Sequence, residues 1–254
     1  MGISKEGKVM KYVFPKDFLW GASTSSHQIE GGLKNNWSEW EILTARERSE
    51  NIPDWYEFPK NVLEEAKDPT KRISGKGCDS YNRWREDIAA LKELGLNSYR
   101  FSIEWSRIFP EKGLVSESGL EYYKELISEL KKNDIEPVLT CWHWTLPLWL
   151  EEEGGLLSSN IDEYFREYFR VLAKNFAGDV KYWITLNEPD IVTSNSYLLG
   201  LWPPCKKNIF TFIYLFYVKM VKLHKIGYEE ITDVNNLALV GVAKNNAALE
   251  PYNK

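Results

Sequence analysis

Short apolar runs alternate with longer stretches of helical periodicity along the 254 residues of this sequence. The runs have the length of buried strands, and the longer stretches place apolar residues every three or four positions, as one face of a helix requires. Asn160, followed three residues later by Glu163, predicts a capping box at the start of one helix. We expect strands over 18–22, 98–103, 137–141, 181–186 and 238–243, and helices over 81–91, 120–130, 161–176 and 209–231.

The alternation of strand and helix predicts parallel strands joined by right-handed crossovers, which a doubly wound sheet and a TIM barrel both satisfy. Two observations favour the barrel. No glycine-rich phosphate loop follows any expected strand, and polar residues follow the carboxyl ends of several strands, where barrels build their sites. These residues are Ser26, Gln28 and Glu30, then Glu104 and Arg107, then His143, and finally Asn187 and Glu188.

The expected barrel is incomplete. Its five strands begin about 55 residues apart, so eight strands would need roughly 150 to 200 residues more than the chain has. Five strands cannot close a barrel, and the first and last strands would leave their edges unpaired. We therefore predict a single domain over residues 1–254, an α/β fold that is part of a (β/α)8 TIM barrel, with about five strands and four main helices.

Charge and hydropathy exclude several function classes. With 32 Lys and Arg against 37 Asp and Glu, the net charge of −5 argues against a nucleic-acid partner, which would select a basic face. The longest apolar run, 209–218, is about half the ~20 residues of a membrane helix, so no membrane partner is expected. The first residues lack the apolar centre of a signal peptide, and the expected location is therefore cytoplasmic.

The cysteine, histidine and aromatic contents refine this picture. Three widely spaced cysteines predict no disulfide framework, and three histidines without ligand spacing predict no metal site. The 11 Trp, 14 Tyr and 11 Phe fit either a large aromatic core or flat surfaces that stack on sugar rings or bases.

Glu188 is the sharpest candidate for chemistry. It follows a buried-type strand and precedes Pro189, which ends the strand ladder and is expected to keep Glu188 extended. Its carboxyl group would then stand at the mouth of the sheet, where desolvation by neighbouring Trp and Leu side chains favours the protonated form. A carboxyl group that stays protonated near neutral pH suits a general acid. The alternative, from the residues alone, is a carboxylate that caps a loop or pairs with an arginine.

Four segments of the chain resemble glycoside hydrolase family 1, the β-glucosidase and β-galactosidase family. They occur in the family's order, and the match runs from about Phe14 to Pro251. The resemblance implies a barrel that hydrolyses β-glycosidic bonds with retention, as an exo-β-glucosidase does, by means of two carboxylates about 5 Å apart. The segments are FPKDFLWGASTSSHQIEG over 14–31, LGLNSYRFSIEWSRIFP over 94–110, LTCWHWTLP over 139–147 and TLNEP over 185–189.

The resemblance also implies a role for each matching residue. Glu188 takes the place of the family's general acid/base, and Asn187 would bind the sugar 2-hydroxyl. Gln28 and His143 would hold the nonreducing sugar, and Trp144 would stand beside them with an indole N–H that can reach a hydroxyl. From the residues alone, Gln28 is equally well a loop amide, and His143 a core or second-layer residue.

Three charged residues complete the set of candidates. Arg100 matches the arginine that stands beside the family's nucleophile, where a fixed guanidinium would keep a carboxylate ionised. An inward-pointing structural ion pair is the alternative for Arg100, and both roles can coexist. We expect Glu30 and Glu104 to be structural partners of arginines near the mouth of the barrel.

The sequence departs from the family pattern in two places. Thr145 stands where the family usually has an acidic residue, which we expect to affect a loop more than the chemistry. The family's nucleophile lies on the seventh strand in a Thr-Glu-Asn-Gly-like motif, and these 254 residues contain no such motif, since Glu250 matches a loop.

We therefore expect the amino-terminal half of a family 1 glycosidase, either a fragment or one half of a split protein, which is nearly inactive alone, takes a β-glucoside or related β-glycoside and needs no cofactor. In the split protein, its partner would be a complementary carboxyl-half chain. One alternative is a non-catalytic carbohydrate-binding or scaffold half-barrel. Another is a deletion product that does not fold and aggregates through its exposed edges.

Overall fold

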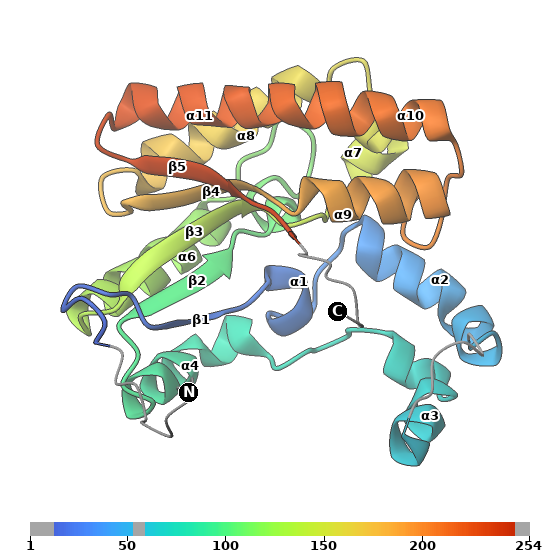
Figure 1. The fold of residues 1–254 in the computed structure, drawn as a ribbon, viewed down its shortest axis with the longest axis horizontal. Helices are drawn as coiled ribbons and strands as arrows, with labels where there is room; N and C mark the ends of the chain where they lie inside the picture. The colour runs from blue at the N-terminus through green and yellow to red at the C-terminus, as the bar shows by residue number, and fades with distance from the viewer. Residues whose placement is uncertain (1–12, 53–58, 247–254) are drawn as a thin grey trace, which may run out of the picture.

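A computed structural model describes residues 13–52 and 59–246 of the chain. Its five strands are all parallel and pair in the order of the sequence, so the expected α/β fold is confirmed. Within the described residues the sheet is not closed, because β1 and β5 each pair with one neighbour (Figure 1). The strands are β1 (Gly21–Ser23), β2 (Ser98–Ser102), β3 (Glu136–Trp142), β4 (Tyr182–Asn187) and β5 (Leu239–Ala243).

Four long helices lie around the outside of the curved sheet, as expected (Figure 1). The last of them continues a shorter helix through a π-helical turn, so the periodic stretch expected over 209–231 is a single helical run. The long helices are α4 (Ser80–Glu93), α6 (Glu117–Lys132), α8 (Ile161–Phe176) and α11 (Met220–Val234), and the run into α11 consists of α10 (Ile209–Tyr214) and η4 (Leu215–Lys219).

The remaining helices are mostly short and lie in the connections between strands and long helices. They are α1 (Ser26–Ile29), α2 (Asn36–Glu50), α3 (Lys60–Ala66), η1 (Pro69–Arg72), α5 (Trp105–Ile108), α7 (Leu148–Glu152), η2 (Gly155–Leu157), α9 (Pro189–Thr193) and η3 (Ser194–Leu199). Helices α1, α2 and α9 lie toward the end of the sheet at which the strand arrows point (Figure 1).

Two local expectations were wrong. Asn160 begins α8, but its side chain makes no capping hydrogen bond. A capping box is found instead at α2, where the Asn35 side chain accepts from the Ser38 backbone and the Ser38 side chain accepts from the Asn35 backbone. The first strand is also shorter than expected, because Phe18 and Trp20 lie outside β1 and are partly exposed.

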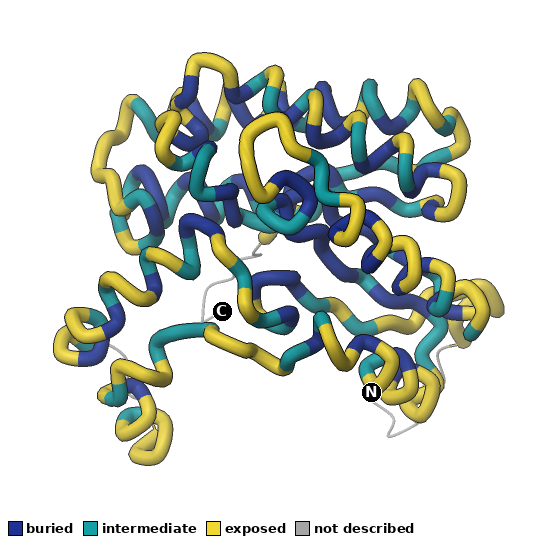
Figure 2. The backbone as a smooth tube through the Cα atoms, turned by 180° about the vertical axis from the view of Figure 1, so that it is seen from behind, coloured by how far each residue is buried: buried dark blue, intermediate teal, exposed yellow. Residues whose placement is uncertain are grey.

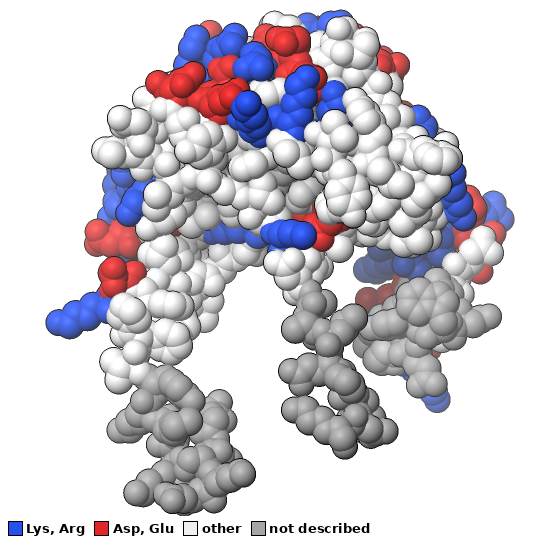
Figure 3. Space-filling model, turned by 45° about the horizontal axis from the view of Figure 1, so that its top comes forward, with Lys and Arg blue, Asp and Glu red and all other residues white. Residues whose placement is uncertain are grey.

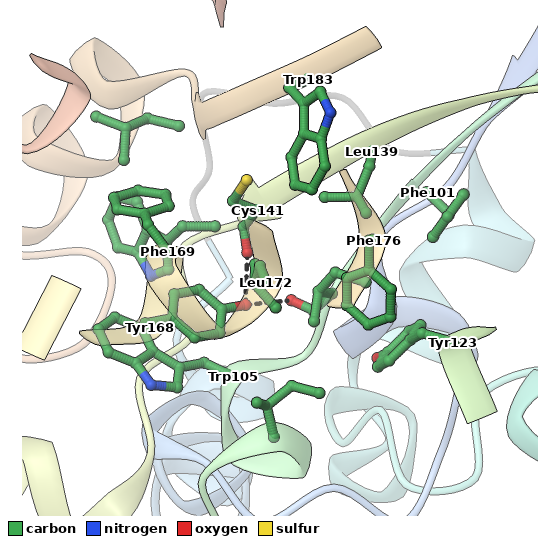
Figure 4. Close-up of a cluster of buried hydrophobic side chains, with 14 of the residues drawn as sticks. Phe101, Trp105, Tyr123, Leu139, Cys141, Tyr168, Phe169, Leu172, Phe176 and Trp183 are labelled. Atoms are coloured by element: carbon green, nitrogen blue, oxygen red, sulfur yellow. Dashed lines mark hydrogen bonds between the residues drawn. The ribbon is translucent and has the colours of Figure 1, made fainter. Parts of the chain in front are cut away.

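Among the described residues, 14 Trp, Tyr and Phe side chains are buried in the core. Buried positions concentrate in the three central strands, β2, β3 and β4, and on the sides of the helices that face the sheet (Figure 2). Trp105 stacks on Tyr168 with ring centroids 4.3 Å apart, and the Tyr168 hydroxyl donates to the Cys141 carbonyl oxygen at 2.7 Å (Figure 4). Packing of α8 on the sheet therefore rests on large rings whose polar atoms have partners, as buried tyrosines require.

The outer surface carries charges of both signs, and Figure 3 shows them gathered along the top of the molecule with a broad uncharged area below. Among the described residues, no helix combines the length and apolar character needed to cross a membrane. Cys78, Cys141 and Cys205 are free thiols.

Candidate active site

Glu188 stands directly after β4, at the carboxyl end of the sheet. Its backbone is left-handed, with φ 41° and ψ 60°, so the extended conformation expected from Pro189 was wrong. Proline only disfavours the right-handed helical region for the preceding residue, and here Pro189 is the first residue of α9, a position it suits well. The turn is secured by the Glu188 N–H, which donates to the Ala243 carbonyl oxygen at 2.7 Å.

A register shift between β4 and β5 precedes this turn. The regular pairing of the two strands is interrupted between Ile184 and Asn187. Irregularities of this kind redirect the side chains that follow and are frequent beside active sites. The left-handed turn of Glu188 is also sterically costly for a residue with a side chain, by about 1–3 kcal/mol.

At most positions an alanine variant is more stable than a glycine variant, but the left-handed backbone of Glu188 predicts the opposite order there. Both Glu188→Gly and Glu188→Ala remove the carboxyl group, but only glycine adopts the left-handed region without steric cost. We expect the glycine variant to be more stable than the alanine variant by about 1 kcal/mol, or roughly 2–4 °C in Tm. Thermal unfolding of the two proteins measures the difference, and an alanine variant that melts at the higher temperature would contradict it.

A chain of hydrogen bonds links Arg100, Asn187 and His143 across β2, β3 and β4. The Arg100 guanidinium donates from Nη2 to the Asn187 side-chain oxygen and from Nε to Thr140 Oγ1 at 3.0 Å. The Asn187 side-chain nitrogen lies 3.1 Å from His143 Nε2. Burial lowers the pKa of Arg100, and the opposite charge of Glu188 acts against that lowering. The structure therefore brings these three predicted site residues together, with Glu188 beside them.

His143 is neutral near pH 7. Burial, together with the positive charge of Arg100 and the neighbouring His27, lowers its pKa to about 4. Its Nδ1 is buried and has no hydrogen-bond partner among the described residues.

Acidification is expected to reduce stability through His143. The pKa of its folded state, about 4, lies below its usual value of 6.5, so the unfolded state binds more protons between these values. Stability is therefore lost as the pH falls through this window, by about 2 kcal/mol between pH 7.5 and pH 5. Urea unfolding of the wild type and of His143→Gln at both pH values measures this contribution as the difference between their pH dependences.

The comparison is designed to cancel other titrations. Burial raises the pKa of Glu30 to about 7, so Glu30 changes stability in the opposite sense, and burial lowers the pKa of His224. Both groups are present in both proteins. If His143→Gln keeps the pH dependence of the wild type, the assignment of a neutral, buried imidazole is wrong.

A pocket of about 130 Å³ brings Gln28, His143 and Trp144 together. Gln28 is exposed, and its side-chain oxygen accepts from Ser25 Oγ at 2.7 Å. The Trp144 indole N–H donates to the Asn187 carbonyl oxygen at 2.8 Å, which leaves the ring rather than the N–H to face a ligand. Glu188 is not among the residues that line this pocket; it is connected to it through Asn187.

The two buried acidic residues near the mouth differ from each other. Glu30 pairs with Arg107 at 2.9 Å and accepts from the Tyr123 hydroxyl at 2.6 Å, so the expected arginine partner was correct. For Glu104 the expectation was wrong, because its carboxylate contacts hydroxyl and amide donors instead of an arginine. These donors are Ser26 Oγ, Asn35 Nδ2, the Ser106 backbone N–H and Oγ, and Thr145 Oγ1.

Trp37, Glu41 and Ser74 are among the pocket-lining residues that sequence reasoning missed. Trp37 lies nearly parallel to Trp144 with ring centroids 5.9 Å apart, and Glu41 lies 3.0 Å from His27 Nε2 and also accepts from Ser74. Trp37 and Glu41 belong to α2, which was not expected at all, and Ser74 lies in a loop. The Asn35 capping signature was the one local signal for this helix.

The structure is an open, partial α/β barrel with Glu188 and a pocket at the carboxyl ends of its strands, and comparison with known proteins gives its family. The family model described as glycosyl hydrolase family 1 matches residues 10–254, and the chain belongs to this family.

Individual relatives agree with this assignment. The chain is 35% identical to a 1,4-beta-D-glucan glucohydrolase of Thermotoga neapolitana over 239 aligned residues. The alignment covers 94% of the chain and 52% of the relative. It is 43% identical to Myrosinase 1 of Brevicoryne brassicae over 197 aligned residues, and this alignment covers 77% of the chain and 39% of the relative.

Among solved structures, a beta-glucosidase from Thermotoga maritima in complex with castanospermine matches with a TM-score of 0.81 and 33% identity. The match covers 95% of this chain and 51% of that structure. The chain thus spans between about two fifths and one half of the length of these proteins.

Proposed function

We propose that this chain supplies the acid/base half of an active site that hydrolyses β-glycosidic bonds with retention. The observation that carries the proposal is the position of Glu188, at the carboxyl end of β4 beside the linked side chains of Asn187, His143 and Arg100. Barrel enzymes place their catalytic residues at the carboxyl ends of the strands, and Glu188 is an acidic residue in such a position. The names of the relatives make a β-glucoside the first substrate to test.

In the proposed reaction, Glu188 acts twice. It first donates a proton to the glycosidic oxygen, so that the alcohol departs as the nucleophile bonds to the anomeric carbon. Glu188, now a carboxylate, then takes a proton from water, and this water displaces the nucleophile and restores the starting configuration. In this proposal the nucleophile lies in the part of the barrel outside these 254 residues, either on the same polypeptide or on a separate one.

The pocket residues are proposed to hold the nonreducing sugar. The Gln28 amide can donate to one hydroxyl and accept from another, and the flat face of Trp144 can pack against the sugar ring. Asn187 has a second amide hydrogen for the 2-hydroxyl, where a hydrogen bond strengthens as charge develops in the transition state. Arg100 would stand next to the arriving nucleophile, and its charge would keep that carboxylate ionised.

The partner proposed for this chain is the remaining part of the barrel, and two surfaces favour it. At the edge of the sheet, Leu239 and Val242 of β5 are 53% and 37% exposed. A stripe of apolar side chains at helical spacing runs along the outside of α10 and α11. Its members are Phe210, Ile213, Tyr214, Tyr217, Val218, Val221 and Tyr228, each at least 45% exposed.

The right-handedness of crossover connections explains why one missing segment would cover both surfaces. A right-handed crossover after β5 would return a helix against β5 and α11, where it would cover the stripe. The remaining barrel strands would pair with the open edges of β1 and β5 and remove both of them.

The test compares the 254-residue chain alone with the same chain joined genetically to the carboxyl half of the Thermotoga maritima beta-glucosidase. We expect no turnover of p-nitrophenyl β-glucoside by the chain alone, because covalent catalysis needs the missing carboxylate, and turnover by the joined protein. The carboxyl half alone is the control. Turnover by the chain alone that disappears in Glu188→Gln would show that a nucleophile is already present and would overturn the division of the site.

One further outcome favours the other candidate, a non-catalytic sugar-binding scaffold, which the intact pocket supports. Binding of glucose or cellobiose by the chain alone, together with a well-folded but inactive joined protein, would replace the catalytic proposal by the binding one.

A further inference from the structure

The peptide unit between Asn187 and Glu188 is held from both sides of β4. Its carbonyl oxygen, which belongs to Asn187, accepts from the Trp144 indole N–H at 2.8 Å. Its N–H, which belongs to Glu188, donates to the Ala243 carbonyl oxygen at 2.7 Å. Trp144 follows β3 and Ala243 ends β5, so the residues that hold this peptide come from the two strands that flank β4 in the sheet.

The backbone of Trp144 is itself strained. Its φ is 77°, in the left-handed region that a bulky side chain rarely adopts. The Thr145 N–H donates to the His143 carbonyl oxygen at 3.0 Å. A hydrogen bond that spans one residue with positive φ closes a γ-turn of the rare, strained form. Such a turn persists only where the surrounding contacts hold it.

Several contacts hold this turn and the indole ring within it. The ring of Trp144 packs against Trp202 with centroids 4.8 Å apart and against Trp37 with centroids 5.9 Å apart. On the backbone, the Thr145 carbonyl oxygen accepts from the Trp142 indole N–H at 2.9 Å. Both the ring and the turn are therefore fixed, and with them the direction in which the Trp144 indole N–H points.

The peptides on both sides of the Glu188 α carbon are fixed in this way. The preceding peptide is held by Trp144 and Ala243. The following peptide is held by α9, because the Glu188 carbonyl oxygen accepts from the N–H groups of Ile191 at 3.0 Å and Val192 at 3.2 Å. Peptides are planar, so two fixed planes determine φ and ψ of the residue between them and the direction of its side chain.

We propose that Trp144 is a positioning residue for Glu188, whose indole N–H fixes the Asn187–Glu188 peptide and thereby directs the Glu188 carboxyl group at the bond to be cleaved. This inference rests on the proposed function, in which Glu188 is the acid/base. The left-handed backbone of Glu188 is costly, so a peptide without this hydrogen bond would rotate to relieve the strain.

The first experiment is NMR of the full chain, as wild type and as Trp144→Phe, which keeps an aromatic ring and removes the N–H donor. In the left-handed region the amide and α protons of a residue are nearly eclipsed, so the wild type should show a strong NOE between them at Glu188. In the variant we expect this NOE to weaken. We also expect exchange of the Glu188 amide proton to become faster by about tenfold or more.

Trp149→Phe is the matched control. The Trp149 indole N–H donates to the Phe109 carbonyl oxygen at 3.0 Å and is likewise partly buried, but Trp149 belongs to α7. This substitution removes the same kind of hydrogen bond and should leave the Glu188 signals as they are in the wild type. Equal changes at Glu188 in both variants would reveal general loosening of the fold and would overturn the proposal.

The second experiment separates a positioning role from a sugar contact, in the joined protein. With an alkyl β-glucoside, whose leaving group needs a proton, we expect Trp144→Phe to lower kcat/KM about tenfold or more. With a dinitrophenyl β-glucoside, whose leaving group needs none, we expect a loss below about threefold. Loss of a contact to the sugar would lower kcat/KM equally for both substrates, because they share the sugar.

The proposal is overturned if Glu188 keeps its strong NOE and slow exchange in Trp144→Phe, or if the two substrates lose kcat/KM equally. Should Trp144→Phe fail to fold, the wild type decides. Its Trp144 indole proton must then exchange as slowly as that of Trp149, and free exchange contradicts the proposal.

Failure of this inference can be told apart from failure of the proposed function. The NMR results do not depend on catalysis, so an inactive joined protein would count against the proposed function alone. Conversely, if Glu188→Gln shows the loss expected of an acid/base while Trp144→Phe changes neither the NMR signals nor kcat/KM, the proposed function stands and the positioning role is wrong.

Discussion

Replacement of Glu188 by glutamine is expected to lower the hydrolysis of an alkyl β-glucoside by the completed barrel about 10²–10⁴-fold. Glutamine keeps the size of the side chain but has no proton to give to a leaving alkoxide and cannot act as a base. The Glu188 side chain makes no capping hydrogen bond to α9, and the left-handed turn and the hydrogen bond to Ala243 involve backbone atoms only, so the fold should be unaffected. The measurement is kcat/KM of the joined protein with and without the substitution.

The leaving group distinguishes an acid from a structural residue. A dinitrophenolate departs without a proton, so the first step for that substrate should be nearly as fast in Glu188→Gln as in the wild type, and a burst of dinitrophenol should precede slow turnover. A small anion such as azide needs no general base, and it should therefore accelerate the second step. An equal loss on all substrates, without a burst and without rescue by azide, would indicate that Glu188 only shapes the site.

Removal of the Glu104 carboxylate is expected to destabilise the chain by about 3 kcal/mol or more. Glu104 is fully buried, and the Glu104→Ala substitution would leave the hydroxyl of Ser26, the amide of Asn35 and the hydroxyl of Thr145 without their acceptor. Because these donors come from α1, α2 and the loop after β3, their loss would loosen three segments at once. Thermal unfolding should show a Tm lower by roughly 6–12 °C.

Two substitutions serve as comparisons. Glu125 is a surface residue whose partner, Arg85, is exposed, and Glu125→Ala should change stability by no more than about 0.5 kcal/mol. Thr145→Asp would place a second carboxylate where Thr145 Oγ1 now lies, 3.1 Å from one oxygen of Glu104, and the two charges would repel each other. A Glu104→Ala variant as stable as Glu125→Ala would refute the view that this buried carboxylate holds the mouth together.

The sheet and its outer helices could be predicted because their sequence periods are strong. The apolar stripe of α8, from Ile161 to Phe176, repeats every three or four residues, and all of its inward positions are buried. The opposite holds for α2, whose buried residues are polar or small, namely Asn36, Glu41, Ala45 and Ser49. A helix that buries polar groups through hydrogen bonds gives no hydrophobic period, so pattern analysis cannot detect it.

The neighbours of the candidate site could be predicted only as far as strand order determines them. Parallel strands bring their carboxyl ends to one edge, and this places Arg100, His143 and Asn187 near one another. Which atoms meet depends on side-chain rotamers and on donor and acceptor matching between strands, and neither is encoded by a local pattern. The same limit explains Glu104, because an acidic residue among hydroxyl donors and one beside an arginine look alike in sequence.

The backbone bond between Glu188 and Ala243 has a mechanical consequence. Ala243 is the last residue of β5, which is an edge strand of the sheet and is partly exposed to solvent. Any element that docks there and shifts this strand pulls directly on the peptide that aims the acid. Docking of the partner and the orientation of the Glu188 carboxyl group would then depend on the same hydrogen bond. A partner docked in the wrong position would therefore misorient the carboxyl group even if every side chain of the site were unchanged.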